Sequence, residues 1–202
     1  MEEAHAMQRV EPILSYWFGP LADDYDAGGN GALWFKKDDG VDSDIRAKFG
    51  ADLDKAIRGD YDDWQDSPRA CLALVILLDQ FSRNIFRGTA RAWEKDPQAL
   101  DIALRAIDRG LDHELRMVER QFLTLPLMHA EDLGLQRRLA ELIEEAVAEA
   151  PEARRESFLM WERAAAQHAD IIERFGRFPH RNALIGRASS EEEIAFLEQP
   201  GS

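Results

Sequence analysis

Arginine, histidine and asparagine are concentrated in two short stretches of this sequence. One is DQFSRNIFRG at residues 79–88, and the other is RFGRFPHRN at residues 174–182. Because guanidinium groups bind carboxylate and phosphate groups in a bidentate manner, arginines in such stretches favour an anion-binding site. The two stretches therefore predict a site for a small anionic ligand. Its candidate ligand-binding residues are Arg83, Asn84, Arg87, Arg177, His180, Arg181 and Asn182.

Both stretches also have a structural explanation. Asp79 follows the apolar run at 70–78, and a carboxylate in such a place is costly unless it is paired. Its partner could be Arg83, one helical turn later, or an arginine of the second stretch. Arg174 and Arg177 come at the end of a predicted helix, where arginines satisfy free carbonyl groups. The sequence alone leaves an ion-pair role and a ligand-binding role open.

Two histidines on different predicted helices are candidates for proton transfer. His129 and His168 each lie on an apolar helical face. An unperturbed imidazole has a pKa of about 6.5, which suits general acid–base catalysis at neutral pH. We predict that one of the two is the proton carrier and that Glu131 or Asp132 orients it, so the candidate catalytic residues are His129, His168 and Glu131. Alternatively, both histidines are neutral, hydrogen-bonded residues of the core.

The spacing of acidic residues, cysteine and histidine predicts no metal site. The stretch DYDAGG at 24–29 resembles the start of a calcium-binding loop, but the fifth and twelfth positions of that loop would be Gly28 and Phe35, which lack side-chain oxygens. No zinc-ligand spacing is present, and the single Cys71 lies in an apolar run, which is typical of a small buried side chain. The sequence contains neither a phosphate-binding glycine loop nor a Gly-x-Ser-x-Gly motif, and the cofactor, if there is one, stays unknown.

The composition limits the partners that we expect. The chain has 202 residues, with 25 Lys and Arg against 39 Asp and Glu, and a net charge of -14. This surplus of negative charge argues against nucleic-acid binding, which needs cations for phosphate contacts. The apolar run at 70–78 is much shorter than the ~20 residues of a membrane span, and the acidic N-terminus is unlike a signal peptide. We expect a soluble, cytoplasmic protein whose partner is a small anionic ligand or a protein or peptide.

Helices are the elements that must position these residues. Apolar residues recur at helical spacing at 8–18, 43–58, 97–109, 118–129, 135–150, 158–175 and 190–197. The run through residue 78 that follows Ser67-Pro68 is apolar on every side, which predicts a central helix buried all round. Ser67 and Asp96 are the predicted N-caps of two of these helices, and residues 19–40 are expected to be a loop anchored by Trp34 and Phe35. Short connections make successive helices pack antiparallel. We predict that residues 1–202 form a single all-α domain, an irregular array of antiparallel helical hairpins.

Four motifs in a fixed order resemble one bacterial family. They are LLDQFSRNIFRG, AWEKDPQAL, LPLMHAEDL and HADIIERFGRFPHRNALIGR, and the resemblance extends over nearly the whole chain. The family is domain of unknown function 924. The resemblance implies an all-α, tetratricopeptide-like fold, and it implies no activity.

Two hypotheses of function follow from different classes of protein. In the first, the Arg/Asn stretches and the histidines converge on a pocket for a small anionic ligand, with or without catalysis. In the second, the chain is a tetratricopeptide-like scaffold whose groove binds a peptide or protein partner. Convergence of Arg83, Arg87, Arg181 and His168 in one partly buried pocket would favour the first hypothesis. An open groove with these residues held in mutual ion pairs would favour the second.

Overall fold

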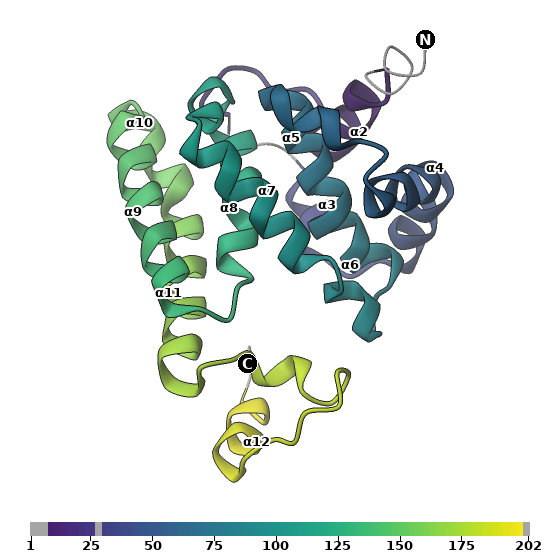
Figure 1. Cartoon of the computed structure of the whole chain (residues 1–202). Helices are drawn as coiled ribbons and strands as arrows, with labels where there is room; N and C mark the ends of the chain where they lie inside the picture. Colours follow the sequence, from purple (N-terminus) through teal and green to yellow (C-terminus); the bar gives the residue numbers. More distant parts are fainter. Residues whose placement is uncertain (1–7, 27–29, 200–202) are drawn as a thin grey trace.

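The structure of the protein is a computed structural model that describes residues 8–26 and 30–199 (Figure 1). These residues form helices and turns without any β-strand among them, so the predicted all-α class is confirmed. The α-helices are α2 (Val10–Phe18), α3 (Gly31–Phe35), α4 (Asp39–Arg58), α5 (Pro68–Val75), α6 (Ser82–Ile85), α7 (Asp96–Asp108), α8 (Met117–Met128), α9 (Leu133–Glu149), α10 (Glu152–Arg155), α11 (Leu159–Phe175) and α12 (Glu191–Leu197).

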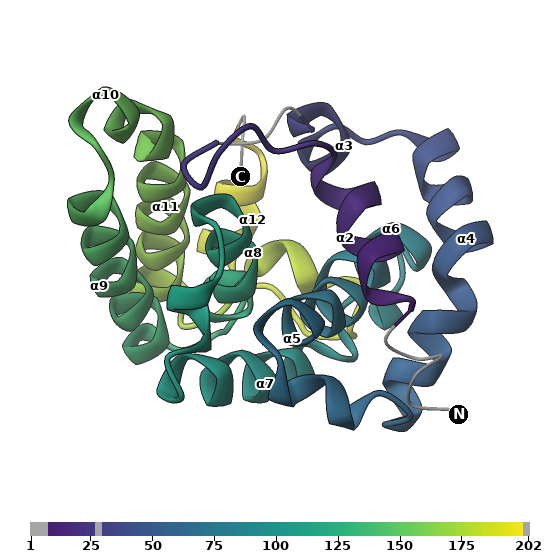
Figure 2. The same cartoon turned by 90° about the horizontal axis from the view of Figure 1, so that it is seen from above.

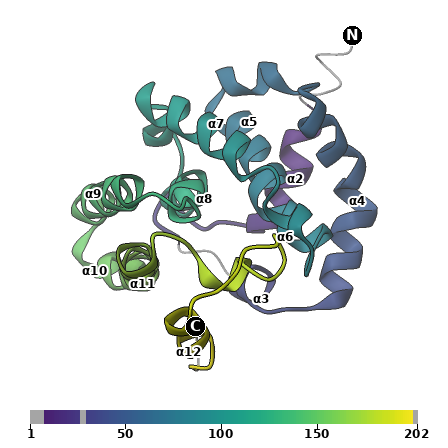
Figure 3. The ribbon, with the colours of Figure 1, turned by 60° about the horizontal axis from the view of Figure 1, so that its bottom comes forward.

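The helices form two groups around the central helix α5. Helices α8, α9 and α11 lie side by side, and the connections at alternate ends make each antiparallel to the next (Figures 1 and 2). On the other side, α5 packs against α2 and α7, and α4 packs against α6. The segment that follows α11 crosses beneath the helices towards α6 and then turns back into α12 (Figure 3). Antiparallel hairpins are thus present, whereas a tetratricopeptide-like arrangement stays a prediction.

The central apolar run at 70–78 is buried along its whole length, as its composition predicts. The helix does not remain regular, because α5 ends at Val75 and a π-helix continues from Ile76 to Phe81. A π-turn inserts one residue into a helix and re-aims the side chains that follow, and such turns are frequent at functional sites. Here the π-helix contains Asp79, which is fully buried.

Local sequence signals set several helix ends. Asp132 accepts a hydrogen bond from the backbone N–H of Leu135 and caps α9, and Ser190 forms the predicted capping box with Glu193 at the start of α12. Helix α11 ends at Gly176, whose φ of 67° is the left-handed conformation that glycine adopts readily. These caps fix where each helix presents its side chains.

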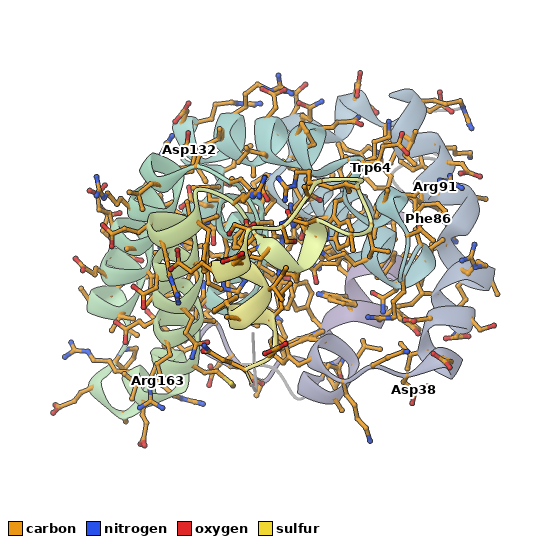
Figure 4. The ribbon with its side chains drawn as sticks, turned by 90° about the horizontal axis from the view of Figure 1, so that it is seen from below. Asp38, Trp64, Phe86, Arg91, Asp132 and Arg163 are labelled. Carbon is orange, nitrogen blue, oxygen red and sulfur yellow. The ribbon has the colours of Figure 1, made fainter. Side chains whose placement is uncertain are left out.

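The structure differs from the prediction in α3, in the start of α4 and in the cap of α7. Residues 19–40 contain the short helix α3 within the expected loop, and α4 begins at Asp39 because Asp38 caps it (Figure 4). Ser67 occupies the predicted N-cap position of α5, with Pro68 as the first helical residue, although its side chain forms no capping hydrogen bond. Asp96 is the first residue of α7 and does not cap it, because its carboxylate faces two arginines in the interior.

Aromatic side chains fill the core beside the central helix. The ring of Trp17 contacts Phe81 and Phe122 edge-on, with centroids 5.5 and 5.6 Å apart. Cys71 is buried in the same core, as predicted, and its burial raises the pKa of its thiol to about 11. Within the described residues, no helix combines the length and the apolar character that crossing a membrane requires.

Candidate functional site

The buried carboxylate of Asp79 is the centre of the candidate site. Its Oδ1 lies 2.8 Å from Nδ1 of His129 and 3.0 Å from Nη1 of Arg83, and its Oδ2 accepts a hydrogen bond from the Gln80 amide. Burial alone would raise the pKa of Asp79, but Arg83, His129 and Gln80 outweigh it and hold this pKa below its usual value. Asp79 is therefore ionised, and its predicted pairing with Arg83 is present.

A second buried carboxylate extends this arrangement. Oδ2 of Asp96 accepts hydrogen bonds from Nη2 of Arg83 at 3.0 Å and from Nη1 of Arg181 at 3.2 Å. Arg181 also donates to the backbone oxygen of His129 at 2.9 Å. We call Asp79, Arg83, Asp96, Arg181 and His129 the charge cluster. Of the two partners that the sequence allowed for Asp79, the structure has Arg83, and Arg181 pairs with Asp96.

The charge cluster keeps His129 neutral and oriented. Burial and the nearby Arg83 guanidinium lower the pKa of His129, and the carboxylates of Asp79 and Asp96 offset only part of this effect. An ionised Asp79 can only accept a hydrogen bond, so Nδ1 of His129 carries the proton. The lone pair of the neutral imidazole is therefore on Nε2. None of the described residues forms a hydrogen bond with Nε2 of His129. This nitrogen can accept a proton from a bound molecule.

His129 faces a cavity of about 450 Å³, which we call cavity A. Its residues come from α3, the π-helix, α6, α8 and α11. They are Trp34, Phe35, Gln80, Arg83, Gln121, Phe122, Leu125, Met128, His129, Met160, Trp161, Ala164 and His168. A volume of this size is typical of pockets for small molecules, and so is a mainly apolar wall with a few polar groups.

His168 provides a second imidazole in cavity A. Its ring lies 6.5 Å from the ring of His129, measured between centroids, and its Nδ1 donates to the backbone oxygen of Ala164 at 2.8 Å. Burial lowers the pKa of His168, and the charge of Arg181 lowers it further. His168 is therefore also neutral with its lone pair on Nε2. The two histidines that the sequence suggested thus lie beside each other at one cavity.

A second cavity of about 590 Å³, cavity B, is lined by Asp96 and Arg181 of the charge cluster and shares His129 with cavity A. It is bounded by the start of α7, the end of α8 and the segment after α11. Its residues are Ala90, Arg91, Trp93, Glu94, Asp96, Pro97, Leu100, Pro126, His129, Ala130, Glu131, Asp132, Leu135, Arg181 and Ile185. Arg83 thus faces cavity A, whereas Arg181 faces cavity B.

Comparison with known proteins places the chain in a family. Residues 13–201 match the family described as "Bacterial protein of unknown function (DUF924)". The chain belongs to the DUF924 family. The structure of ATU0120, a protein of unknown function from Agrobacterium tumefaciens, is similar with a TM-score of 0.81 and 35% sequence identity, over 95% of this chain and 98% of that one. Among proteins with curated descriptions, none matches the sequence.

The family assignment confirms the resemblance seen in the four motifs. Both the family and the structural neighbour are described by their lack of a known function.

Five of the predicted ligand-binding residues line neither cavity, namely Asn84, Arg87, Arg177, His180 and Asn182. Asn84 and Arg87 bind the carboxylate of Asp42 on α4, with Asn84 Nδ2 and Arg87 Nη2 each 2.8 Å from Oδ1. Arg177 forms a bidentate pair with Glu193 at 2.6 and 2.8 Å. Asn182 is buried, and its amide donates to the Ser189 hydroxyl at 3.0 Å. These polar groups tie elements together, which leaves Arg83 and Arg181 as the arginines of the two stretches at the cavities.

His180 and Glu131 also have structural partners. The His180 ring lies between Phe178 and Trp93, with centroid distances of 5.6 and 6.4 Å, and burial together with the neighbouring Arg181 lowers its pKa to about 4. Glu131 binds the Arg187 guanidinium at 2.6 and 2.8 Å and the Phe178 N–H at 2.8 Å.

The carboxylate that orients His129 is therefore Asp79, and not Glu131 or Asp132 as the sequence suggested. Glu131 follows α8 and is bound by the segment after α11, and Asp132 caps α9. No group of three or more His, Cys, Asp or Glu side chains within the described part of the chain could hold a metal ion.

Sequence reasoning did not propose several residues at the site. Asp96 is predicted only as a helix cap, Gln80 lies in the DQFSRNIFRG stretch without a predicted role, and Gln121 and Trp161 belong to none of the motifs. For Asp79 the sequence predicts an arginine partner, but it does not indicate the additional contacts with His129 and Gln80. The available signal was the cost of burying its charge, which predicts more than one polar partner for it.

Proposed function

We propose that this DUF924 protein binds a small molecule with an apolar body and an anionic end in cavity A, and that His129 exchanges a proton with it. The observation that carries the proposal is the 2.8 Å contact between Asp79 and Nδ1 of His129 at the wall of this cavity. A buried carboxylate on Nδ1 fixes the tautomer of an imidazole and stabilises its protonated form during catalysis. Asp79 is thus a positioning residue and His129 the proton carrier.

The lining of cavity A indicates the kind of ligand. Aromatic and methionine side chains make up most of its wall and suit an apolar body. Arg83, His129 and His168 form the polar part of the wall, together with two glutamine amides. These groups suit a carboxylate or similar anion, which would accept hydrogen bonds from them.

Binding of an anion should be coupled to uptake of a proton. The two arginines of the charge cluster are balanced by Asp79 and Asp96, so they leave no surplus positive charge while His129 is neutral. The lowered pKa values of His129 and His168 would rise beside a bound anion. The ligand should therefore bind more tightly near pH 5.5 than near pH 7.5, provided that it remains ionised.

One observation favours the alternative, a tetratricopeptide-like scaffold that binds a peptide or protein without catalysis. Phe35 and Met160, which line cavity A, are each 67% exposed. Exposed apolar side chains around a cavity can accept an apolar side chain of a peptide. The two hypotheses differ in the ligand. A free small molecule binds in the first, whereas only a peptide or protein binds in the second.

Thermal unfolding separates these hypotheses. The purified protein is heated with apolar carboxylates such as phenylacetate and hexanoate, with inorganic phosphate, and with short acidic peptides that contain one aromatic residue. A ligand at about 100 times its dissociation constant stabilises by about 2.7 kcal/mol, which raises the Tm by roughly 5 to 10 °C for a chain of this size. Shifts with the carboxylates support the proposal, whereas shifts with the peptides alone support the scaffold.

A matched pair of variants locates the binding site. Ala164 lines cavity A, while Ala166 is exposed on the same helix α11. Ala164→Trp should fill the cavity and abolish the shift, and Ala166→Trp should retain it. Equal responses of the two variants would place the ligand elsewhere.

A third variant tests the role of His129. His129→Gln should still bind the carboxylate, but its affinity should change less between pH 7.5 and 5.5 than that of the wild type. An unchanged pH dependence would contradict proton exchange at His129.

A further inference from the structure

We propose that cavity A catalyses the keto–enol tautomerisation of a 2-oxo acid with an apolar side chain, with His168 as the base and a protonated His129 as the acid. The inference rests on the function proposed above for cavity A. It adds a second catalytic residue, a reaction and a class of substrate. The accessible nitrogens of the two histidines, their unequal partners and a free nitrogen of Arg83 carry the argument.

Both histidines present an accessible nitrogen to cavity A. In each ring Nδ1 is held by a partner within the protein, which leaves the two Nε2 atoms for a ligand. Within the described part of the chain, neither Nε2 is among the unpartnered polar atoms that are sealed from solvent. The centroids of the His129 and His168 rings lie 6.5 Å apart. Since a group that transfers a proton must come within about 3 Å of the reacting atom, both rings can reach neighbouring atoms of one ligand.

The partners of the two histidines decide which one carries a proton when an anion is bound. The buried carboxylate of Asp79 stabilises an imidazolium ion at His129. His168 is held only by the neutral backbone carbonyl of Ala164, and the charge of Arg181 opposes a second positive charge there. Two adjacent imidazolium ions would also repel each other. A bound anion therefore brings in one proton, which His129 holds while His168 stays neutral.

An acid and a base side by side can move a proton between two atoms of one ligand. Nε2 of His168 takes a proton from C3 of the 2-oxo acid, and the electron pair of the broken C–H bond forms a double bond between C2 and C3. The π electron pair of the ketone moves onto its oxygen, which takes the proton from Nε2 of His129. The product is the enol, with His168 protonated and His129 neutral. Proton exchange with solvent restores the starting state, and the reaction consumes no oxidant, reductant or other reactant.

Arg83 and the apolar wall indicate the class of substrate. The two Nη atoms of Arg83 bind Asp79 and Asp96, whereas its Nε binds none of the described residues and is not sealed from solvent. This nitrogen can donate to the carboxylate of a ligand. The aromatic side chains of the wall suit an aryl group. Among acids with an apolar body, a 2-oxo acid offers a C–H bond that an imidazole can break, because the ketone takes up the electron pair. Phenylpyruvate has all of these features.

Exchange of hydrogen for deuterium at C3 of phenylpyruvate tests the reaction. The protein and phenylpyruvate are mixed in D₂O, and proton NMR follows the C3 signal against a sample without protein. The protein should accelerate the loss of this signal. Because the reaction needs one protonated and one neutral histidine, the acceleration should pass through a maximum as the pH is varied. No acceleration, or an acceleration that does not depend on pH, would overturn the proposal.

A matched pair of histidine variants tests the role of His168. His168→Gln should lower the kcat of exchange by at least about 100-fold and change the KM little, because Arg83 still binds the carboxylate. His113 is the control, since its side chain is 53% exposed and lines neither cavity. His113→Gln should keep the full rate. Equal rates in the two variants would contradict a catalytic role of His168. If His168→Gln does not fold, the pH profile of the wild type decides.

Failure of this proposal differs from failure of the function proposed for cavity A. If phenylpyruvate raises the Tm without faster exchange at C3, the tautomerisation is wrong and ligand binding in cavity A stands. If phenylacetate raises the Tm and phenylpyruvate does not, the class of substrate is wrong. If no carboxylate raises the Tm and exchange is not accelerated, both proposals are wrong.

Discussion

Asp79 is the residue on which the candidate site depends. It is fully buried and ionised, and it contacts both His129, the proposed proton carrier, and the arginine that faces cavity A. Removing one partner of a buried ion pair leaves an uncompensated charge, which is far more costly than the loss of an exposed pair.

Asp79→Asn should therefore destabilise the protein by about 3 to 5 kcal/mol, because Arg83 loses a buried partner. The exposed pair of Asp101 and Arg105 supplies the control, and Asp101→Asn should cost less than about 1 kcal/mol. Urea denaturation measures both values. Similar free energies of unfolding for the two variants would show that the Asp79 pair contributes little.

The stability of the protein should fall as the pH is lowered below neutrality. The pKa of His129 is lowered in the folded protein, so the unfolded chain binds more protons between its ordinary pKa of about 6.5 and the folded value. The free energy of unfolding should decrease in this window by at most about 1.4 kcal/mol per pH unit for this histidine. Below the pKa of His129 in the folded protein, the contribution of this histidine to the free energy of unfolding is completely lost.

Urea denaturation between pH 7.5 and 5 checks this dependence. His168 and His180 also have lowered pKa values and contribute in the same direction. His129→Gln should consequently reduce the fall without removing it. A steeper fall in the variant than in the wild type would show that the charged form of His129 is favoured in the folded protein.

At this scale the sequence predicts contacts only where the partners are near in the chain or their chemistry is distinctive. Asp79 and Arg83 lie one helical turn apart, so their pairing could be predicted. The partner of Asn84 and Arg87 is Asp42, which precedes them by more than 40 residues, and no local pattern indicates it. Asp96 was misinterpreted because an aspartate before a proline is also a common helix start.

At the scale of elements, the end of α8 determines where His129 lies. Gln136 of α9 is buried and donates its amide to the backbone oxygens of Met128 and Ala130 at 2.8 and 2.9 Å. These carbonyl groups flank His129 and have no partner within the helix. The side chain of Gln136 thus supports the backbone on either side of His129, the proposed proton carrier.

Gln136→Leu should destabilise the protein by about 1 to 3 kcal/mol, because it leaves buried carbonyl groups without donors. Gln167→Leu on α11 is the control, since Gln167 is exposed. Both free energies can be obtained from urea denaturation. If the two variants are equally stable, another group, such as water, satisfies these carbonyl oxygens.

Periodicity predicted most long helices to within a few residues, for example α2 and α11. It could not predict the π-helix from Ile76 to Phe81, because an apolar run buried on every side has no periodic face that would show the inserted residue. It also missed α3, whose five residues are too few for a periodic signal. Irregular elements of this kind carry Asp79 and line cavity A.

At the scale of the whole molecule, ion pairs hold the segment after α11 against the helices. Arg181 binds Asp96, and Arg187 binds Glu131 between α8 and α9. Phe178 of the same segment is fully buried. The all-α class could be predicted from the sequence, but the position of this segment could not, because its partners come from distant parts of the chain.

Arg187→Met should loosen the segment with little effect on the rest of the protein. We expect faster amide hydrogen exchange at residues 178–189, since Glu131 would hold the segment only through the Phe178 N–H. Mass spectrometry of the exchanged peptides measures this. Arg174→Met, which removes an exposed pair with Glu192, should leave exchange at 178–189 unchanged. The same exchange in both variants would mean that the other contacts of the segment hold it without the Arg187–Glu131 pair.

The pairing of Arg181 with Asp96 also bears on how the protein is synthesised. The ribosome releases the residues around Asp79, Asp96 and His129 well before Arg181, so a nascent chain that has emerged only as far as α11 holds Asp96 with a single arginine. The wall of cavity B likewise lacks Arg181 and Ile185 until then. Helices can form earlier during translation, but the charge balance around His129 is complete only when this last segment has left the exit tunnel.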